Sequence, residues 1–407
     1  MALGPDVRAL EAVVARRQHS LFSEDTVASR PAIKARLGGA RVLVVGGGGS
    51  IGSSTTRLLL PFGATAIHVV DQNENYLAEL VRDLRGSPEG VPDLDLRALA
   101  LDYGSPIMNR FLAEASPYDV VLNFAAMKHV RSEKDVYSLL QMVDTNLVRH
   151  ARFLKWLADH GHGRTYFAVS TDKAANPTSL MGASKRLMED LVFARAAVRG
   201  AVTTSARFAN VAFSNGSLLQ SFLVRLARRQ PFAAPRDTER YFISQREAGE
   251  LCLLAASAVP DQHIVFPRLD PTLELQSLES IAIRVLGHFG LEAERYNDES
   301  AARRDVELLA RAGRWPLVLT PRDTSGEKEY EQFIGEGERA ADLGMPSVMA
   351  ISHQPTTSQT IDLVRFLDAV VNNPQRPIDK AELVRVISSV LSGFHHIETG
   401  RNLDQRL

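Results

Sequence analysis

The feature that most constrains the fold of this chain is a regular alternation of short β-branched runs with helical stretches between Arg41 and about Asn210. Parallel strands cannot be joined by tight turns, so they need crossover segments, which are usually helices. Six runs have the length and residue types of strands: Arg41–Val45, Ala66–Val70, Leu96–Leu101, Asp119–Asn123, Thr165–Val169 and Val202–Phe208. The pattern predicts an α/β chain with a Rossmann-type doubly wound parallel sheet.

The rest of the chain divides into segments around this unit. Residues 1–40 contain one amphipathic helix and a polar connector, and we expect a helical arm there. Residues 41–215 form the expected Rossmann domain. Residues 216–335 are less regular and contain several prolines, which suits a smaller mixed substrate-binding lobe, and residues 336–407 form a helical C-terminal extension. The expected helices with named bounds are Asn73–Leu84, Lys134–Asp159, Thr360–Val371 and Asp379–Leu391.

Composition excludes several classes of protein. Lys and Arg total 47 against 48 Asp and Glu, so a chain that mainly coats nucleic acid is not expected. Cys252 is the single cysteine and cannot form an internal disulfide. No run approaches the roughly 18 apolar residues of a membrane span, and Asp6 and Glu11 interrupt the place of a signal peptide. We therefore expect a cytoplasmic protein with no membrane span and no nucleic-acid partner.

A glycine motif, Gly46-Gly-Gly-Gly49-Ser-Ile-Gly52, follows the first expected strand and opens a helix. This is the context of a dinucleotide-binding loop. Gly46 would make the tight turn, Gly49 would let the backbone approach a pyrophosphate, and Gly52 would let the helix pack on the strand. Ser50 and Ile51 begin the helix, whose N-terminus would face the phosphates.

Acidic residues end the next two expected strands. Asp71 stands 19 residues after Gly52, where a carboxylate can bind both ribose hydroxyls of adenosine and repel a 2′-phosphate. This position favours NAD over NADP. The alternative is that Asp71 only caps the following helix, a role that Asn73 could take instead. Asp102 and Tyr103 end the third strand, where the adenine ring would lie.

Further motifs make the sequence resemble the extended short-chain dehydrogenase/reductase superfamily. Within it, the chain is similar to the nucleotide-sugar 4,6-dehydratases that act on UDP-N-acetylglucosamine and related sugars, a family of polysaccharide biosynthesis. The resemblance covers roughly residues 41–335. Besides the glycine motif, it is carried by Asn123–Val130, Asn146, Ser170–Pro177, Met181–Arg186, Arg207–Val211, Arg240–Phe242 and Gly326–Lys328.

One position departs from most of that superfamily. A Tyr usually stands four residues before the Lys that corresponds to Lys185, and here the position holds Met181. A thioether is neither an acid nor a base, so the hydroxyl proton must go elsewhere. The resemblance still implies a dehydratase, because similar N-acetylhexosamine dehydratases include members with Met there and an Asp-Lys pair on the preceding strand. The alternative is a non-catalytic protein in which Met181 is a packing residue.

The resemblance assigns roles to the residues around Met181. In a 4,6-dehydratase, oxidation at C4 of the sugar acidifies the C5 proton, a base removes that proton, and an acid helps the C6 hydroxyl leave as water. Asp172 and Lys173 are suited to be this acid and base. Lys185 would hold the nicotinamide ribose and stabilise the developing C4 oxyanion, and Thr171 can donate to the same oxygen. Ala125 is expected to line the cofactor site.

Substrate contacts follow from the same resemblance. Asn210, with Ser217 nearby, is implied at the nucleotide diphosphate, and Glu327 at the ribose. Lys128 and Arg240 are candidate anion binders, with solvated surface charge as the alternative for both. In the relatives an Arg usually stands three residues before Glu327, whereas this chain has Thr324 there. The nucleotide base therefore stays open.

The sequence thus predicts an NAD-dependent 4,6-dehydratase acting on a nucleotide-activated N-acetylhexosamine for surface polysaccharide or amino-sugar synthesis. The alternatives are a nucleotide-sugar epimerase and a non-catalytic NAD-binding sensor. His160 with His162, and His395 with His396, have no carboxylate or Cys partner in sequence reach, so no metal is expected. Helical pairing favours a homo-oligomer, a dimer or larger.

Overall fold

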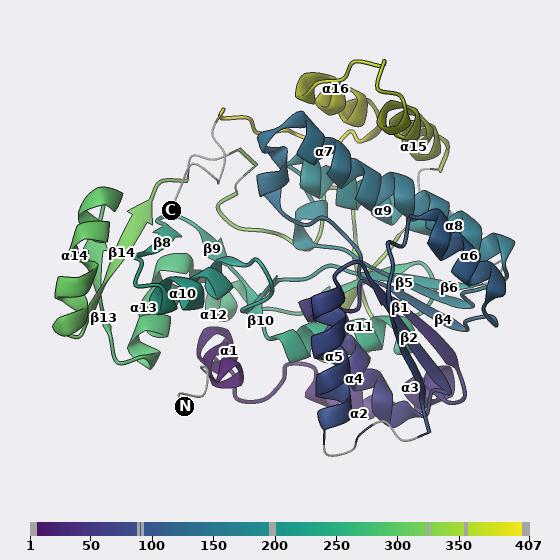
Figure 1. The fold of residues 1–407 in the computed structure, drawn as a ribbon, viewed down its shortest axis with the longest axis horizontal. Helices are drawn as coiled ribbons and strands as arrows, with labels where there is room; N and C mark the ends of the chain where they lie inside the picture. The colour runs from purple at the N-terminus through teal and green to yellow at the C-terminus, as the bar shows by residue number, and fades with distance from the viewer. Residues whose placement is uncertain are drawn as a thin grey trace.

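The computed structural model describes residues 6–87, 90, 93–194, 201–322, 325–326, 328–353 and 357–400. A nine-stranded sheet with helices on both faces forms the larger part, and a smaller lobe lies beside it (Figure 1). The strand order is β15-β16-β11-β6-β5-β4-β1-β2-β3. The predicted Rossmann-type doubly wound sheet is confirmed.

Six strands of this sheet are the ones that the sequence predicts, with ends shifted by at most two residues. Each pairs in parallel with its neighbours, so Val42 of β1 lies opposite Ile67 on one side and Val120 on the other. The strand order reverses between β1 and β4: β2 and β3 are added on one side of β1, and β4, β5 and β6 on the other. The six are β1 (Arg41–Val45), β2 (Ala66–Asp71), β3 (Asp95–Ala100), β4 (Val120–Asn123), β5 (Thr165–Val169) and β6 (Val202–Ala206).

Three further strands come from segments that the sequence assigned to the lobe and to the C-terminal extension. β11 (His263–Pro267) adds to β6 in parallel, and β16 (Val348–Ser352) and β15 (Ala340–Asp342) follow antiparallel. The expected boundaries at 215 and 335 therefore do not separate the sheet from the rest. Prolines marked the stretch after 216 as irregular, but Pro235 and Pro267 end strands, a position in which proline is tolerated.

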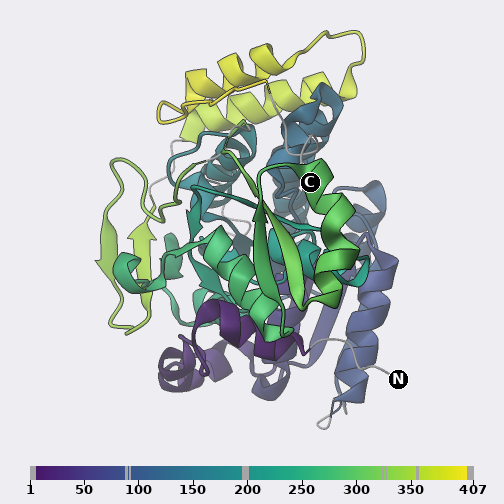
Figure 2. The ribbon, with the colours of Figure 1, turned by 90° about the vertical axis from the view of Figure 1, so that its left-hand side faces the viewer.

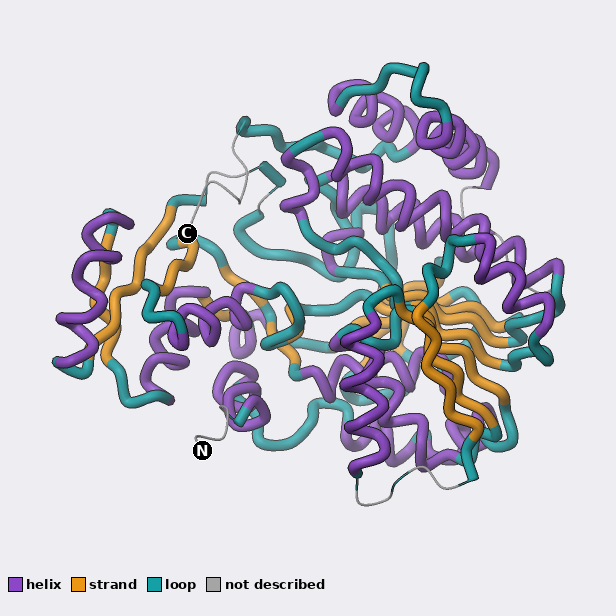
Figure 3. The backbone as a smooth tube through the Cα atoms, in the orientation of Figure 1, coloured by secondary structure: helices purple, strands orange, loops and turns teal. Residues whose placement is uncertain are grey.

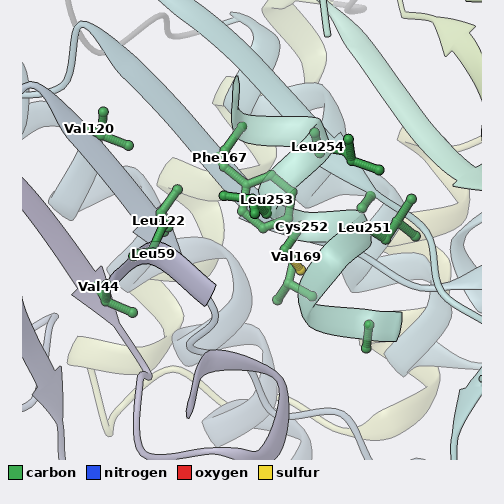
Figure 4. Packing of buried hydrophobic residues seen from close by; sticks show 14 of the residues in the cluster. Val44, Leu59, Val120, Leu122, Phe167, Val169, Leu251, Cys252, Leu253 and Leu254 are labelled. Atoms are coloured by element: carbon green, nitrogen blue, oxygen red, sulfur yellow. The ribbon is translucent and has the colours of Figure 1, made fainter. Parts of the chain in front are cut away.

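Alternate residues of each strand point to opposite faces, and this alternation builds two cores. Val42 and Val44 point into the core that is covered by α4 (Ser50–Leu59) and α11 (Gln245–Ala258). Figure 4 shows this core, which includes the buried Cys252. Leu43 enters the opposite core. The helices over that second core are α6 (Pro106–Glu114), α7 (Val136–Val143), α8 (Arg149–Asp159) and α9 (Leu180–Ala194).

The long helix predicted over Lys134–Asp159 is interrupted. A short 3-10 turn, η2 (Val130–Lys134), precedes α7, whose cap is the Asp135 carboxylate, and a π-helical turn, η3 (Asp144–Val148), joins α7 to α8. Such turns often occur at functional sites. The π turn carries Asn146, which accepts a hydrogen bond from the Met127 N–H in the loop after β4.

The N-terminal arm differs from the single helix that was expected. It holds α1 (Val7–Ala15), α2 (Ser23–Ala28) and α3 (Arg30–Leu37). α1 packs on the small lobe, whereas α2 and α3 pack on α11 beneath the sheet. Helices of six and eight residues are too short to show a clear period in the sequence, so the sequence pattern missed them.

The small lobe has a parallel three-stranded sheet in the order β13-β14-β8. Figure 2 views the molecule from the side of this lobe, with α1 against it. Its strands are β8 (Phe232–Pro235), β13 (Glu292–Tyr296) and β14 (Arg314–Thr320), and its helices are α10 (Leu218–Ala227), α13 (Leu278–His288) and α14 (Glu299–Arg311). Shorter elements are β7 (Asn210–Val211) paired with β10 (Phe242–Ile243), β9 (Glu239–Arg240) paired with β12 (Gln276–Ser277), and α12 (Pro271–Glu274).

Two helices close the chain, as predicted. α15 (Thr357–Asn372) and α16 (Lys380–Val390) pack over α9 and the π turn, where Leu367 and Ile387 join the second core. The chain then continues as a loop (Figure 3), in which the His395 and Ile397 N–H groups donate to the Pro177 and Thr178 carbonyls. None of the helices in the described ranges combines the length and apolarity of a bilayer-spanning segment.

Candidate active site

The loops that carry the predicted motifs meet at one edge of the sheet. In a parallel sheet the carboxyl ends of all strands lie on the same edge, and ligands bind where the strand order reverses. Here that point lies between β1 and β4. The glycine motif follows β1, Ala125 follows β4, and the segment from Ser170 follows β5, so the topology brings the cofactor and catalytic candidates together.

The glycine loop has the shape of a phosphate cradle. Gly46 has a φ of +70°, and a Cβ there would lie 2.6 Å from the Ala125 nitrogen. A Cβ on Gly52 would lie 2.5 Å from the Gly46 carbonyl oxygen. Gly49 is the N-cap of α4 and supplies no side-chain cap, so first-turn N–H groups face outward. Ser50 accepts a hydrogen bond from the Asn215 N–H at 2.9 Å, which ties this loop to the predicted substrate segment.

Asp71 fixes the glycine loop, and Asn73 caps the next helix. The Asp71 carboxylate accepts from the backbone N–H groups of Gly48 and Asn73, both at 2.9 Å. Asn73 Oδ1 accepts from Tyr76 N–H at the start of α5 (Glu74–Gly86). The alternative role of Asp71 as that cap is therefore wrong. Its carboxylate remains partly exposed, with lone pairs left for two hydroxyls.

Asp102 and Tyr103, just beyond the end of β3, are engaged differently from what was expected. The Asp102 carboxylate accepts from Arg149 and from the Gly104 N–H. The Tyr103 ring is buried edge-on against Phe153, and its hydroxyl donates to the Thr145 carbonyl. The Tyr103 side chain therefore belongs to the core rather than to a surface that adenine could reach.

Buried polar groups set the floor of the site. Asn123 Oδ1 accepts from Ala125 N–H at 3.0 Å, and its amide donates to the Tyr166 hydroxyl. His150 Nε2 lies 2.7 Å from the same hydroxyl, and burial lowers the pKa of His150 to about 3, so its ring is neutral. This network fixes the loop against which Gly46 packs.

Asn146 joins the same loop to α9. Its Oδ1 accepts from Met127 N–H, and its Nδ2 donates to the Met127 carbonyl, both at 2.9 Å. The amide also donates to Ser184 Oγ at 3.0 Å. Only the resemblance, and no chemical signal, marked Asn146 in the sequence.

The two candidate residues on α9, Met181 and Lys185, are buried. Lys185 donates from Nζ to the Val169 carbonyl at 2.6 Å, and burial lowers its pKa to about 8. The Met181 side chain is 2% exposed and lies in the second core. Its backbone N–H donates to Glu133 Oε1, and Glu133 Oε2 lies 3.3 Å from His396 Nε2 in the C-terminal loop.

The predicted acid and base form a close pair in a short 3-10 turn, η4 (Asp172–Ala174). Lys173 Nζ lies 3.0 Å from Asp172 Oδ1, and the Thr171 hydroxyl donates to the same oxygen at 2.9 Å. A Cβ on Gly182 would lie 2.5 Å from the Lys173 carbonyl oxygen, so the first turn of α9 packs directly on this pair. The structure therefore brings Thr171, Asp172 and Lys173 together.

A carboxylate that the sequence analysis missed completes this cluster. Glu331 Oε1 lies 3.7 Å from Lys173 Nζ and 3.9 Å from Arg240 Nη2. Burial alone would lower the pKa of Lys173, but the charges of Asp172 and Glu331 raise it above its ordinary value. Lys173 is therefore a cation at neutral pH. Nothing in the local pattern around Glu331 predicts a contact with a residue so distant along the chain.

The two basic residues that are candidates for binding the substrate lie in different surroundings. Arg240 is buried and donates to the carbonyl oxygens of Glu239, Lys328 and Glu329, so it is not a solvated surface charge. Lys128 is exposed and has no hydrogen-bond or ion-pair partner in the described part of the chain, yet the protein atoms around it lower its pKa. An exposed lysine whose pKa is lowered by surrounding protein atoms is expected where the side chain lies in a recess of the surface.

The remaining substrate candidates lie on the same side. Asn210 pairs through its N–H with the Tyr241 carbonyl in the two-stranded β7-β10 unit. Ser217 caps α10, since its Oγ accepts from Gln220 N–H at 3.2 Å. Glu327 and Thr324 lie outside the described residues. Within those residues, no group of three or more His, Cys, Asp or Glu side chains could hold a metal.

A largely buried ion cluster, in which the Arg207 and Glu189 side chains are fully buried, supports the site from below. Arg207 pairs with Glu189 of α9 through two hydrogen bonds, at 2.9 and 2.7 Å, and with Glu338 at 2.5 and 2.8 Å. Ser170 donates to Glu189 at 2.6 Å, so the cluster ties the end of β5 to α9 and to the segment before β15. The resemblance includes Ser170 and Arg207 of this cluster, and no local sequence pattern marks Glu189 or Glu338 as their partners.

A family model described as "Polysaccharide biosynthesis protein" matches residues 42–353, from the first strand of the sheet to its last. The chain belongs to this family. The resemblance to a polysaccharide biosynthesis family drawn from the motifs is thus confirmed.

Relatives within this family and beyond it have several names. The chain is 29% identical over 73% of its length to an uncharacterized membrane protein of Methanocaldococcus jannaschii, of which it covers 81%. It is 26% identical over 80% of its length to the probable polysaccharide biosynthesis protein EpsC of Bacillus subtilis, of which it covers 51%. It is 24% identical over 61% of its length to UDP-N-acetylglucosamine 4,6-dehydratase (inverting) of Campylobacter jejuni, of which it covers 73%. The chain thus spans only about half of EpsC.

Solved structures share the fold. Pen from Bacillus thuringiensis has a TM-score of 0.62 at 20% identity, with 83% of this chain and 99% of that one covered. DesIV, a dTDP-glucose 4,6-dehydratase from Streptomyces venezuelae solved with NAD and TYD bound, has a TM-score of 0.55 at 18% identity, with 82% and 97% covered. At these identities the likeness concerns the fold.

Proposed function

We propose that this member of the polysaccharide biosynthesis family is an NAD-dependent 4,6-dehydratase of a nucleotide-activated N-acetylhexosamine, with UDP-N-acetylglucosamine as the first substrate to test. The observation that carries the proposal is the paired Asp172 and Lys173, held beside α9 where Met181 supplies no acid or base. A 4,6-dehydratase needs such a pair for C5 and C6.

The glycine loop fits the proposed cofactor. The backbone leaves no room for a Cβ at Gly46 or Gly52, and the uncapped first turn of α4 offers N–H groups to a pyrophosphate. Asp71 keeps acceptor capacity for the adenosine ribose, which favours NAD over NADP. When bound, NAD would supply the acceptor that oxidises C4 and the donor that reduces C6.

Side chains of the protein would carry out the proton transfers at C4, C5 and C6. Thr171 donates to Asp172 in the structure, so a proton leaving the C4 hydroxyl can pass through Thr171 to the Asp172 carboxylate. Lys173 is placed to remove the C5 proton, and protonated Asp172 to deliver its proton to the C6 hydroxyl as that group leaves. The C4 hydroxyl proton thus ends in the water that is lost. Lys185, charged and buried, would stabilise negative charge at the C4 oxygen.

The substrate is proposed to lie between the sheet and the small lobe. We assign Asn210 of β7, Ser217 at the start of α10 and Lys128 after β4 to this side, and the Asn215–Ser50 hydrogen bond joins the segment before Ser217 to the cofactor loop. Arg240 is proposed to position the Lys328–Glu331 segment rather than to bind phosphate, because backbone carbonyls already occupy its guanidinium. A role for Glu327 at the ribose stays a prediction, as does a homo-oligomeric state.

A nucleotide-sugar epimerase is the second candidate, because UDP-glucose 4-epimerase of Rickettsia typhi is 29% identical over 55% of this chain. An epimerase needs no acid at C6, whereas Asp172 is present beside Lys173. Incubation of the purified protein with UDP-N-acetylglucosamine, followed by mass spectrometry, separates the candidates. Loss of one water supports the dehydratase, an isomer of unchanged mass supports the epimerase, and no reaction supports a non-catalytic protein.

A further inference from the structure

A short segment of the C-terminal extension lies between the turn of the proposed acid and base and the chain just before Glu327. We call this segment, residues 394–400, the C-terminal strap. Phe394 is 5% exposed and packs in the second core, which anchors the strap after α16. The family model matches residues 42–353, so the strap lies outside it and the resemblance assigns it no role.

The strap bonds through its backbone to a segment on each side. On one side, the His395 N–H donates to the Pro177 carbonyl at 3.2 Å. The Ile397 N–H donates to the Thr178 carbonyl at 2.9 Å, directly after the turn of the catalytic candidates. On the other side, the Ile397 carbonyl accepts from the Gly326 N–H at 3.0 Å. The strap therefore joins these two segments as a middle strand joins its neighbours in a sheet.

Side chains fasten the strap to the second of these segments. Ser325 is buried, and its hydroxyl donates to Glu398 Oε1 at 2.6 Å. The same hydroxyl accepts from the Thr399 N–H at 3.0 Å. Lys380 of α16 pairs with the other oxygen of Glu398. Burial alone would raise the pKa of Glu398, but its hydrogen bonds and the Lys380 ammonium lower it to about 2, so the carboxylate is charged at neutral pH.

The turn of the catalytic candidates has further contacts that do not involve the strap. A Cβ on Gly182 would lie 2.5 Å from the Lys173 carbonyl oxygen, so α9 packs directly on the turn. Asn176 Oδ1 accepts from the Glu336 N–H at 2.9 Å, which fixes the far end of the turn. Loss of a strap side chain should therefore shift residues 325–326 more than it shifts the turn.

We propose that Glu398 is a positioning residue for the nucleotide end of the substrate, which acts by holding Ser325 and Gly326 against the strap. The inference rests on the proposed function, because it takes the substrate to be a nucleotide sugar. Glu327, for which the resemblance implies a contact with the ribose, directly follows Gly326 in the sequence. A shift of this segment should weaken nucleotide binding and leave the chemistry at the turn unchanged.

Glu398→Ala removes the acceptor for the Ser325 hydroxyl, whereas Glu398→Gln keeps an acceptor oxygen and loses the charge. The measurement is the steady-state rate of water loss from UDP-N-acetylglucosamine. We expect Glu398→Ala to raise KM about tenfold and to change kcat by at most about twofold, since a hydrogen bond to a charged group is worth about that factor. Glu398→Gln should raise KM less. Glu382→Ala, which breaks a surface pair with Arg385 on α16, is the matched control and should keep both constants.

Ser325→Ala tests whether the two side chains act through their mutual contact. It should raise KM by a factor similar to that of Glu398→Ala. The double variant should then be little worse than either single variant, because the second substitution has no contact left to remove. Effects that multiply in the double variant would mean independent roles and would contradict the assignment.

UDP is the probe that separates this inference from the proposed function, because its binding needs no catalysis. In calorimetric titrations, Glu398→Ala should raise the Kd for UDP about as much as KM and leave the affinity for NAD unchanged. A wild-type protein that binds UDP but removes no water from the sugar refutes the dehydratase, and weaker UDP binding by Glu398→Ala then still supports the positioning role. An unchanged Kd for UDP, a fall in kcat as large as the change in KM, or a wild-type protein that binds no UDP would overturn the inference.

Discussion

Arg207→Met removes the only cation that pairs in bidentate fashion with Glu189 in the described cluster, and it should destabilise the sheet domain strongly. The Arg207 and Glu189 side chains are both 0% exposed. Replacing Arg207 with Met keeps the packing of the aliphatic part of the side chain but leaves the fully buried Glu189 and the largely buried Glu338 without their main partner. Ser170 would still donate to Glu189, and Arg186 would still lie 3.2 Å from each carboxylate.

The size of the effect follows from burial. Breaking a buried ion pair by removing one partner typically costs about 3–5 kcal/mol, because the remaining charge stays desolvated. Arg186 offsets part of that cost, so we expect about 3 kcal/mol. Arg229→Met is the matched control: Arg229 pairs with Glu307 at 2.9 Å on the surface, where the loss should be at most about 1 kcal/mol.

The pH dependence gives the sharper test. Burial alone would raise the pKa of Glu189, but Arg207 lowers it to about 2. A folded-state pKa below the unfolded one contributes stability that is present above about pH 4.5 and lost as pH falls toward 2. Without Arg207, burial should raise the pKa of Glu189. Protonation of Glu189 in acid therefore no longer destabilises the variant, as it does the wild type. The gap in unfolding free energy between wild type and variant should therefore narrow from pH 7 to pH 4.

Urea unfolding followed by the fluorescence of the two tryptophans, Trp156 on α8 and Trp315 on β14, measures this gap at both pH values. A gap below about 1 kcal/mol at pH 7, or one that widens as the pH falls, would refute the reasoning. In that case the cluster would not stabilise the floor of the site through its charges.

Three further predictions concern the site. Asp71→Ser should raise the affinity for NADP relative to NAD in calorimetric titrations, and wild-type protein that binds NADP as tightly as NAD would contradict the role of Asp71. Gly52→Ala places a methyl group 2.5 Å from the Gly46 carbonyl and should weaken NAD binding at least about tenfold, or about 1.4 kcal/mol, whereas Gly86→Ala, in open space, should not. Thr171→Val breaks the donor to Asp172 and should slow C4 oxidation in stopped-flow absorbance, while Thr171→Ser restores it; equal rates for both would remove Thr171 from the proton path.

The parts of the fold that the sequence predicts are those with local signals. β1 to β6 appear as short β-branched runs, and the glycine motif marks the turn after β1. β11 and β16 also contain β-branched residues, but they lie outside the alternation of strands and helices, and their place in the sheet depends on pairing with residues far away in the chain. β15 has no such run and is a strand only through its pairing with β16. The same holds for α2 and α3, which are held by packing on α11 rather than by their own period.

The candidate site divides in the same way. Asp172 and Lys173 are neighbours in sequence and pair in the structure as their chemistry indicates. Glu331 belongs to the same cluster, but its contact depends on how the segment after β14 folds back, which no sequence pattern encodes. For Tyr103 the position near the end of β3 is visible in the sequence, but the packing against Phe153 that turns its ring inward is not.

The central claim is that this chain removes water from a nucleotide-activated sugar with Lys173 as the base at C5. The most direct measurement is incubation of the wild-type protein and Lys173→Met with UDP-N-acetylglucosamine in D2O, with mass spectrometry and NMR of the products. The account predicts a wild-type product that has lost one water and carries deuterium at C5, and neither change with Lys173→Met. A wild-type product of unchanged composition with C4 inverted, or full water loss with Lys173→Met folded and cofactor-bound, would contradict it.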